Sequence, residues 1–143
     1  MPDYKEAIRR LELLKSQITK ITGNEMVNFA LDNIRTGSWE GRKWQPRNAK
    51  ARRNQGRALL VDTGRGRRSI DDKIEGDTVK LVAEEYMVAH NEGVNETVSV
   101  RGGRRKAHTR KMKLPQRQFT GDSDKQTERI NKIIANKIVQ ALT

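Results

Sequence analysis

The side chains best suited to acid–base or metal chemistry are few in this sequence and lie far apart along the chain. The two histidines, His90 and His108, are 18 residues apart and lack the close pairing that is typical of zinc ligands. His108 lies among arginines and lysines, which repel a cation. A structural or partner-facing role is therefore the favoured interpretation of His90, with catalysis as the alternative.

The carboxylates do not form a recognisable catalytic pair. Asp71 and Asp72 are adjacent, so on a β-strand they point to opposite faces. Glu84, Glu85 and Glu92 are close in sequence, but they lack a recognised arrangement for the divalent metal that a nuclease needs. The sequence therefore gives no support to a hydrolytic metal site.

Nucleophile and phosphate-loop motifs are also missing. Ser69 is not in a GxSxG context, and Asp62-Thr63-Gly64 is not part of a GxxxxGK[ST] phosphate loop. The chain has no cysteine, which removes disulfides, thiolate metal ligands and cysteine nucleophiles. We therefore expect no enzymatic activity, no cofactor and no bound metal.

Positive charge is the strongest feature of the composition, with a formal net charge of +12. Residues 42–68 contain ten basic residues and one acid, and residues 101–117 contain eight basic residues and no acid. The rest of the chain is net acidic, so the surplus belongs to two segments. The residues that we expect to contact a partner protein or DNA are Arg42, Lys43, Arg47, Lys50, Arg52, Arg53, Arg57, Arg104, Arg105, Lys106, Arg110 and Lys111.

Three interpretations of these basic segments compete. They are disordered tips that repel one another, or they bind nucleic-acid phosphates while Trp39 and Trp44 stack on unpaired bases, or they dock on acidic protein surfaces. Docking within an assembly is favoured, because the planar arginine side chain pairs bidentately with carboxylates. Residues 42–57 and 102–110 should then be mobile or extend away from the core of an isolated subunit.

Three helices are predicted from apolar residues at three- and four-residue steps. The first covers residues 3–22 and stops at Gly23, the second covers residues 24–36, and the last covers about residues 123–142. Ser123 and Gln126 match a capping box at the start of the last helix. Residues 38–58, which have little periodicity, are expected to form a long basic loop.

Strands are predicted in the middle of the chain. Residues 68–75 and 78–84 alternate around Gly76-Asp77, which indicates a hairpin, and a short helical stretch follows over residues 86–92. Residues 97–101 and 111–114 are further strand candidates on either side of a basic tip. We therefore predict one α+β domain over residues 1–143. A small antiparallel sheet of about four strands packs with two N-terminal helices and a long C-terminal helix, and basic loops protrude at about 38–58 and 101–111.

Three stretches, read in order, resemble a known family. Residues 60–70 contain a turn into a hairpin, residues 86–93 read YMVAHNEG, and residues 114–121 read LPQRQFTG before the last helix. This series is similar to the virion morphogenesis or tail completion family of tailed phages and prophages, typified by P2-like and Mu-like phages. The residues that carry the resemblance and are expected to determine the fold are Asp62, Thr63, Gly64, Ser69, Tyr86, His90, Gly93, Pro115, Arg117, Phe119 and Gly121.

Two positions depart from the family pattern. Gly66 stands where the family usually has a leucine, so a local core contact is lost or replaced, and Gln118 stands where a second proline is common. Independently of the family, Phe119 is a large apolar anchor before the closing helix. Tyr86 and Val88 are expected to pack beneath the sheet.

The resemblance implies a structural protein at the head–tail junction, which finishes the tail or joins it to the filled head. Such proteins work as an oligomeric ring or within one, so other virion proteins of the tail or neck are the expected partners, and contact with packaged DNA stays open. No apolar run approaches the ~20 residues that span a membrane, so we expect assembly in the host cytoplasm and a place in the virion. The alternative is a stand-alone basic nucleic-acid-binding protein.

Overall fold

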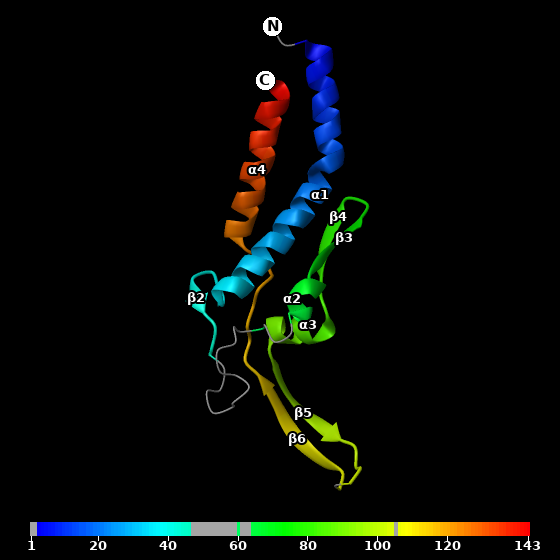
Figure 1. Ribbon diagram of the computed structural model, residues 1–143, viewed down its shortest axis with the longest axis vertical. Helices are drawn as coiled ribbons and strands as arrows, with labels where there is room; N and C mark the ends of the chain where they lie inside the picture. The colour runs from blue at the N-terminus through cyan, green and yellow to red at the C-terminus, as the bar shows by residue number, and fades with distance from the viewer. Residues whose placement is uncertain (1–2, 47–59, 61–63, 105) are drawn as a thin grey trace.

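Two long helices lie side by side and run in opposite directions, and three small β-hairpins lie beside or beyond one end of this pair (Figure 1). The computed structural model describes residues 3–46, 60, 64–104 and 106–143. Helix α1 (Tyr4–Thr36) starts, and helix α4 (Asp124–Leu142) ends, at the same free end of the pair. The prediction of an α+β fold is confirmed.

Helix α1 is one helix of 33 residues, so the prediction of two helices separated at Gly23 is wrong. Asp3 caps its start by accepting a hydrogen bond from the Lys5 N–H at 3.0 Å, and Gly37, with φ 64°, ends it. Gly23 is buried, and a Cβ there would collide with the Asp72 carboxylate. The glycine therefore allows Asp72 to approach the helix closely. In a helix interior, glycine lowers the helix stability by about 1 kcal/mol relative to alanine.

The strands form three separate antiparallel hairpins, so the prediction of a single sheet of about four strands is wrong. The pairs are β1 (Ser38–Trp39) with β2 (Arg42–Lys43), β3 (Asp71–Glu75) with β4 (Thr78–Val82), and β5 (Val94–Val100) with β6 (His108–Leu114). The predicted turn at Gly76-Asp77 is confirmed. Helix α3 (Glu85–Glu92), also predicted, lies between the second and third hairpins and directs them apart (Figure 1).

The segment before the second hairpin is helical instead of extended. Helix α2 (Arg65–Ser69) begins after Gly64, whose φ of 79° favours glycine. The Ser69 hydroxyl donates to the Gly66 carbonyl at 2.6 Å and accepts from the Glu84 N–H at 3.1 Å. The serine thereby fastens α2 to the junction between β4 and α3.

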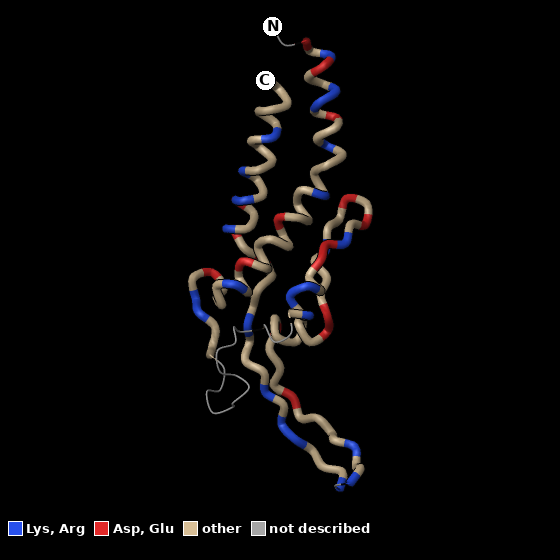
Figure 2. The backbone as a smooth tube through the Cα atoms, viewed as in Figure 1, with Lys and Arg blue, Asp and Glu red and all other residues tan. Residues whose placement is uncertain are grey.

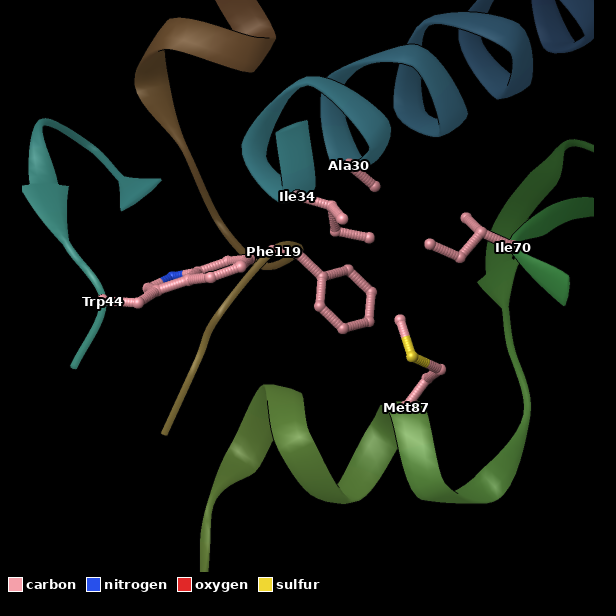
Figure 3. Packing of buried hydrophobic residues seen from close by; sticks show 6 residues of the cluster. All are labelled: Ala30, Ile34, Trp44, Ile70, Met87 and Phe119. Carbon is pink, nitrogen blue, oxygen red and sulfur yellow. The ribbon is translucent and has the colours of Figure 1, made fainter. Parts of the chain in front are cut away.

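The hydrophobic core gathers side chains from segments far apart in the sequence (Figure 3). Its buried members are Ala30, Ile34, Trp44, Ile70, Met87 and Phe119. Met87 is fully buried, whereas Tyr86 and Val88 are 45% and 42% exposed, so the prediction that these two pack beneath a sheet is wrong. Successive residues of a helix point about 100° apart, so when Met87 faces the core, Tyr86 and Val88 face away from it.

The loop predicted over residues 38–58 is partly ordered by this core. The first hairpin occupies its start, and the Trp44 side chain is buried. The expectation that the basic segment extends from the core is therefore wrong for residues 42–46, while residues 47–58 lie outside the described part of the chain.

Helix α4 begins as predicted, with the Ser123 hydroxyl accepting from the Gln126 N–H at 3.3 Å. It packs against α1, and none of its residues is fully buried. The Arg129 guanidinium lies 3.4 Å from a carboxylate oxygen of Glu25 and 3.5 Å from one of Asp32, and also 5.7 Å from the centre of the Phe29 ring. These contacts set the position of α4 along the helix pair.

Gly66 shows how a departure from the family pattern is compensated. A Cβ at this buried position would lie 2.5 Å from the Met87 sulfur and 2.6 Å from the Tyr86 hydroxyl, so these side chains occupy the space that a leucine would fill. We expect Gly66→Leu to lower the free energy of unfolding by about 1–3 kcal/mol, as overpacking usually does. In the Gly66→Leu background, Met87→Ala should cost less than it does in the natural chain, with a coupling of about 0.5–3 kcal/mol in urea titrations. Strict additivity of the two changes would contradict this account.

Candidate interaction surface

The third hairpin is a projecting arm. Each of its strands has seven residues, paired from Val94 opposite Leu114 to Val100 opposite His108. Seven residues at about 3.3 Å each give an arm about 23 Å long. It points away from the helix pair (Figure 1), and no other helix or strand of the described residues packs extensively on it. We call residues 94–114 the arm; its described part agrees with the prediction that residues 102–110 extend from the core.

The two faces of the arm differ in chemistry. The register places Val98, Val100 and Met112 on one face, where all three are only partly buried. The opposite face carries polar and basic side chains that are all exposed: Asn95, Thr97, Ser99, Thr109, Lys111 and Lys113. An isolated two-stranded hairpin is marginally stable in water. The face with the three apolar side chains also carries exposed Glu96, Arg110 and His108, and no other helix or strand of the described residues packs extensively on it, so the arm is available as a surface for contact.

The far end of the arm is strongly basic (Figure 2). Its described basic residues are exposed and form no ion pair within the described part of the chain: Arg101, Arg104, Lys106, Arg110 and Lys111. The His108 Nδ1 atom lies 3.1 Å from the Lys106 carbonyl oxygen. Unpaired like charges repel one another, so the tip favours an acidic partner.

The base of the arm is fixed by the stretch that follows β6. The Asn91 Oδ1 atom accepts hydrogen bonds from the Phe119 and Thr120 N–H groups at 2.9 and 3.0 Å. The Asn33 side-chain amide donates to the Phe119 carbonyl at 3.1 Å. Helices α1 and α3 therefore both hold the segment that carries Phe119, whose side chain is 1% exposed.

A second set of hydrogen bonds joins the same stretch to the start of the basic loop. The Trp44 indole N–H donates to the Gln118 carbonyl at 2.9 Å. The buried Arg117 guanidinium donates to the Gln45 carbonyl at 3.2 and 3.3 Å, and the Arg117 N–H donates to the His90 carbonyl at 2.8 Å. The segments with the family-like patterns, residues 86–93 and 114–121, thus meet at the root of the arm.

Several predicted fold residues lie at this root, and others do not. Gly93 has a φ of 77°, and its Cα faces Gln116 closely enough that a Cβ would lie 3.2 Å from the Gln116 backbone. Pro115 is partly buried, and Gly121, with φ 154°, is packed against the Gln118 side chain. Asp62 and Thr63 lie outside the described residues. The contributions of Asn33, Asn91 and Trp44 were missed, and only Asn91, which lies beside His90 within a family-like stretch, offered a sequence signal.

The two basic segments are not brought together in the described part of the chain. Arg42 and Lys43 are exposed on β2, which lies beside the end of α1, far from the tip of the arm (Figure 2). The remaining predicted contact residues fall outside the described residues: Arg47, Lys50, Arg52, Arg53, Arg57 and Arg105. The buried Trp44 has no face for stacking on a base, and Trp39 packs edge-on against Phe29, with ring centres 5.9 Å apart.

The titratable residues do not assemble into one site. His90 lies near the root of the arm and His108 near its tip, so the strands separate them. Asp71 is exposed while Asp72 faces Gly23 of α1, and the two thus point to opposite faces, as predicted. Within the described residues, no group of three His, Asp or Glu side chains is placed to hold a metal ion, and none of the helices there is long and apolar enough to cross a membrane.

These features define a small α+β protein that carries a basic, protruding β-hairpin arm on a compact joint. Its sequence matches the model of the phage virion morphogenesis family over residues 6–139, nearly the whole chain, and the protein belongs to that family. Comparison with curated proteins and with solved structures gave no match. Family membership assigns it a role in phage virion morphogenesis, and with it association with other phage proteins and the virion.

Proposed function

We propose that this protein is a non-enzymatic structural component of the head–tail junction, which completes the tail or joins it to the filled head. It acts as an oligomeric ring, is assembled in the host cytoplasm and contacts tail or neck proteins. The observation that carries the proposal is the arm, an amphipathic hairpin with a basic tip that the rest of the subunit leaves uncovered.

An arm of this kind suits assembly in two ways. Its position is fixed by part-buried hydrogen bonds at the root, so the tip is presented in a defined direction. A ring would also repeat the contact once per subunit, and linked weak contacts gain affinity through effective concentration. Such an assembly can thus be strong although each arm buries little surface.

Binding of nucleic acid alone is the less supported function. Single-strand binders combine basic grooves with aromatic side chains on which bases stack, but the arm contains no Phe, Tyr or Trp and Trp44 is buried. The basic tip remains suited to phosphates, so contact with the packaged DNA end is compatible with a place at the junction.

The proposal predicts a defect in joining when the protein is absent. A phage or induced prophage lacking the chain should accumulate filled heads and tails separately, as counted by electron microscopy, and should regain joined particles when the natural protein is supplied in trans. Arg104→Glu/Lys106→Glu/Arg110→Glu should fail to restore joining. The control Lys5→Glu/Arg9→Glu/Lys15→Glu changes the net charge equally on exposed positions of α1 and should restore it. Normal joining without the protein would overturn the proposal.

A further inference from the structure

The subunit carries an excess of acidic residues in one segment and an excess of basic residues at the tip of the arm. Residues 71–92, which span β3, β4 and α3, contain seven Asp and Glu residues and two lysines. We call residues 71–92 the acidic segment. The tip of the arm is the opposite, and it lies at the end of the arm that is remote from α3, whereas the β3–β4 hairpin lies beside α1 (Figures 1 and 2).

The acidic segment has both free acids and uncovered apolar side chains. Glu75 is engaged by Lys73 at 2.9 Å and Lys80 at 3.0 Å, which lower the pKa of its carboxyl. Others are exposed and form no ion pair within the described residues: Asp71, Asp77, Glu85 and Glu92. The same segment exposes four large apolar side chains by 40–45%, namely Ile74, Val82, Tyr86 and Val88.

The arm is complementary to this segment in both respects. It carries unpaired basic residues at the tip, and Val98, Val100 and Met112 on one face. Within one subunit the arm leads away from the β3–β4 hairpin, so its tip does not meet the acidic segment of its own chain (Figure 1). The complementary surfaces therefore have to meet between two subunits.

We propose that the arm of one copy of this protein docks on the acidic segment of a second copy. Two different surfaces then form a head-to-tail contact, which generates a closed ring if the rotation between subunits closes. The inference rests on the proposed function, since it names the contact that would build the ring. Apolar contact supplies the area, while the charges set orientation and exclude like-charged alternatives.

The test uses full-length protein and two triple variants. Variant one reverses the arm with Arg104→Glu/Lys106→Glu/Arg110→Glu, and variant two reverses the acidic segment with Asp71→Lys/Asp77→Lys/Glu85→Lys. All six side chains are exposed, so circular dichroism should show both variants folded. In sedimentation velocity, the natural chain should self-associate, and each variant alone should associate at least about tenfold more weakly because like charges then face each other.

Mixing the two variants in equal amounts gives the discriminating result. A reversed arm then meets a reversed acidic segment, and a natural arm meets a natural segment, so the two variants should assemble with each other as alternating copies. The equal-charge control Lys5→Glu/Arg9→Glu/Lys15→Glu should assemble normally. Failure of the mixture to assemble, or equal damage by the control, would overturn the inference, as would a natural chain that stays monomeric; the particle-joining assay tests the proposed function separately.

Discussion

Replacing Phe119 by alanine is expected to lower the free energy of unfolding by about 3–5 kcal/mol, as loss of a buried aromatic side chain generally does. Phe119 is 1% exposed and packs with Ile34 and Met87 in the core (Figure 3). Its backbone also holds Asn33 of α1 and Asn91 of α3. The cavity would therefore open where both helices and the root of the arm meet, and collapse around it would disturb all three.

The measurement is chemical denaturation followed by circular dichroism, with Tyr4→Ala as the matched control. Tyr4 is 75% exposed, so removing its ring should change stability by less than about 0.5 kcal/mol. Similar losses for the two variants would show that Phe119 is not an anchor of the core. Phe119→Leu should recover part of the loss, because most of the buried volume is retained.

The elements were largely predictable because local patterns specify them. The apolar periodicity of α4, its serine cap and the Gly76-Asp77 turn all act within a few residues, and the structure confirms them. Gly23 was misleading because its reason is tertiary: it admits Asp72 from a strand about 50 residues away in sequence. The prediction of a single sheet was wrong for a related reason. Alternation of apolar and polar residues predicts strands but does not specify which strands pair.

The interaction surface was predictable in charge but not in shape. The density of basic residues predicted that the loop at about residues 101–111 protrudes, and this loop forms the tip of the arm. The same charge pattern predicted that Arg42 and Lys43 belong to an extended loop. The next residue, Trp44, is buried in the core and thereby holds their strand close to it. A tryptophan in a basic segment suits a binding face and a core equally well, and only its indole hydrogen bond to the Gln118 carbonyl decides between them.

Asn91 accepts two of the hydrogen bonds at the root of the arm, which leads to the second large effect. Asn91→Ala should leave the Phe119 and Thr120 N–H groups without their acceptor, at 2.9 and 3.0 Å in the natural chain. A part-buried donor that loses its partner costs about 1–3 kcal/mol, so two such donors make this one of the more damaging polar substitutions. Denaturation should show the loss, and hydrogen exchange should be faster at these two amides than elsewhere in the core.

Two variants separate this role from a general effect of changing an asparagine. Asn91→Asp keeps an oxygen in place to accept both hydrogen bonds at neutral pH and should stay close to the natural stability. Asn95→Ala, on the exposed polar face of the arm, should be nearly neutral. Unchanged exchange at Phe119 and Thr120 in Asn91→Ala would refute the assignment. If exchange rises there while the core stays folded, the direction of the arm, and hence assembly, should fail before the subunit itself unfolds.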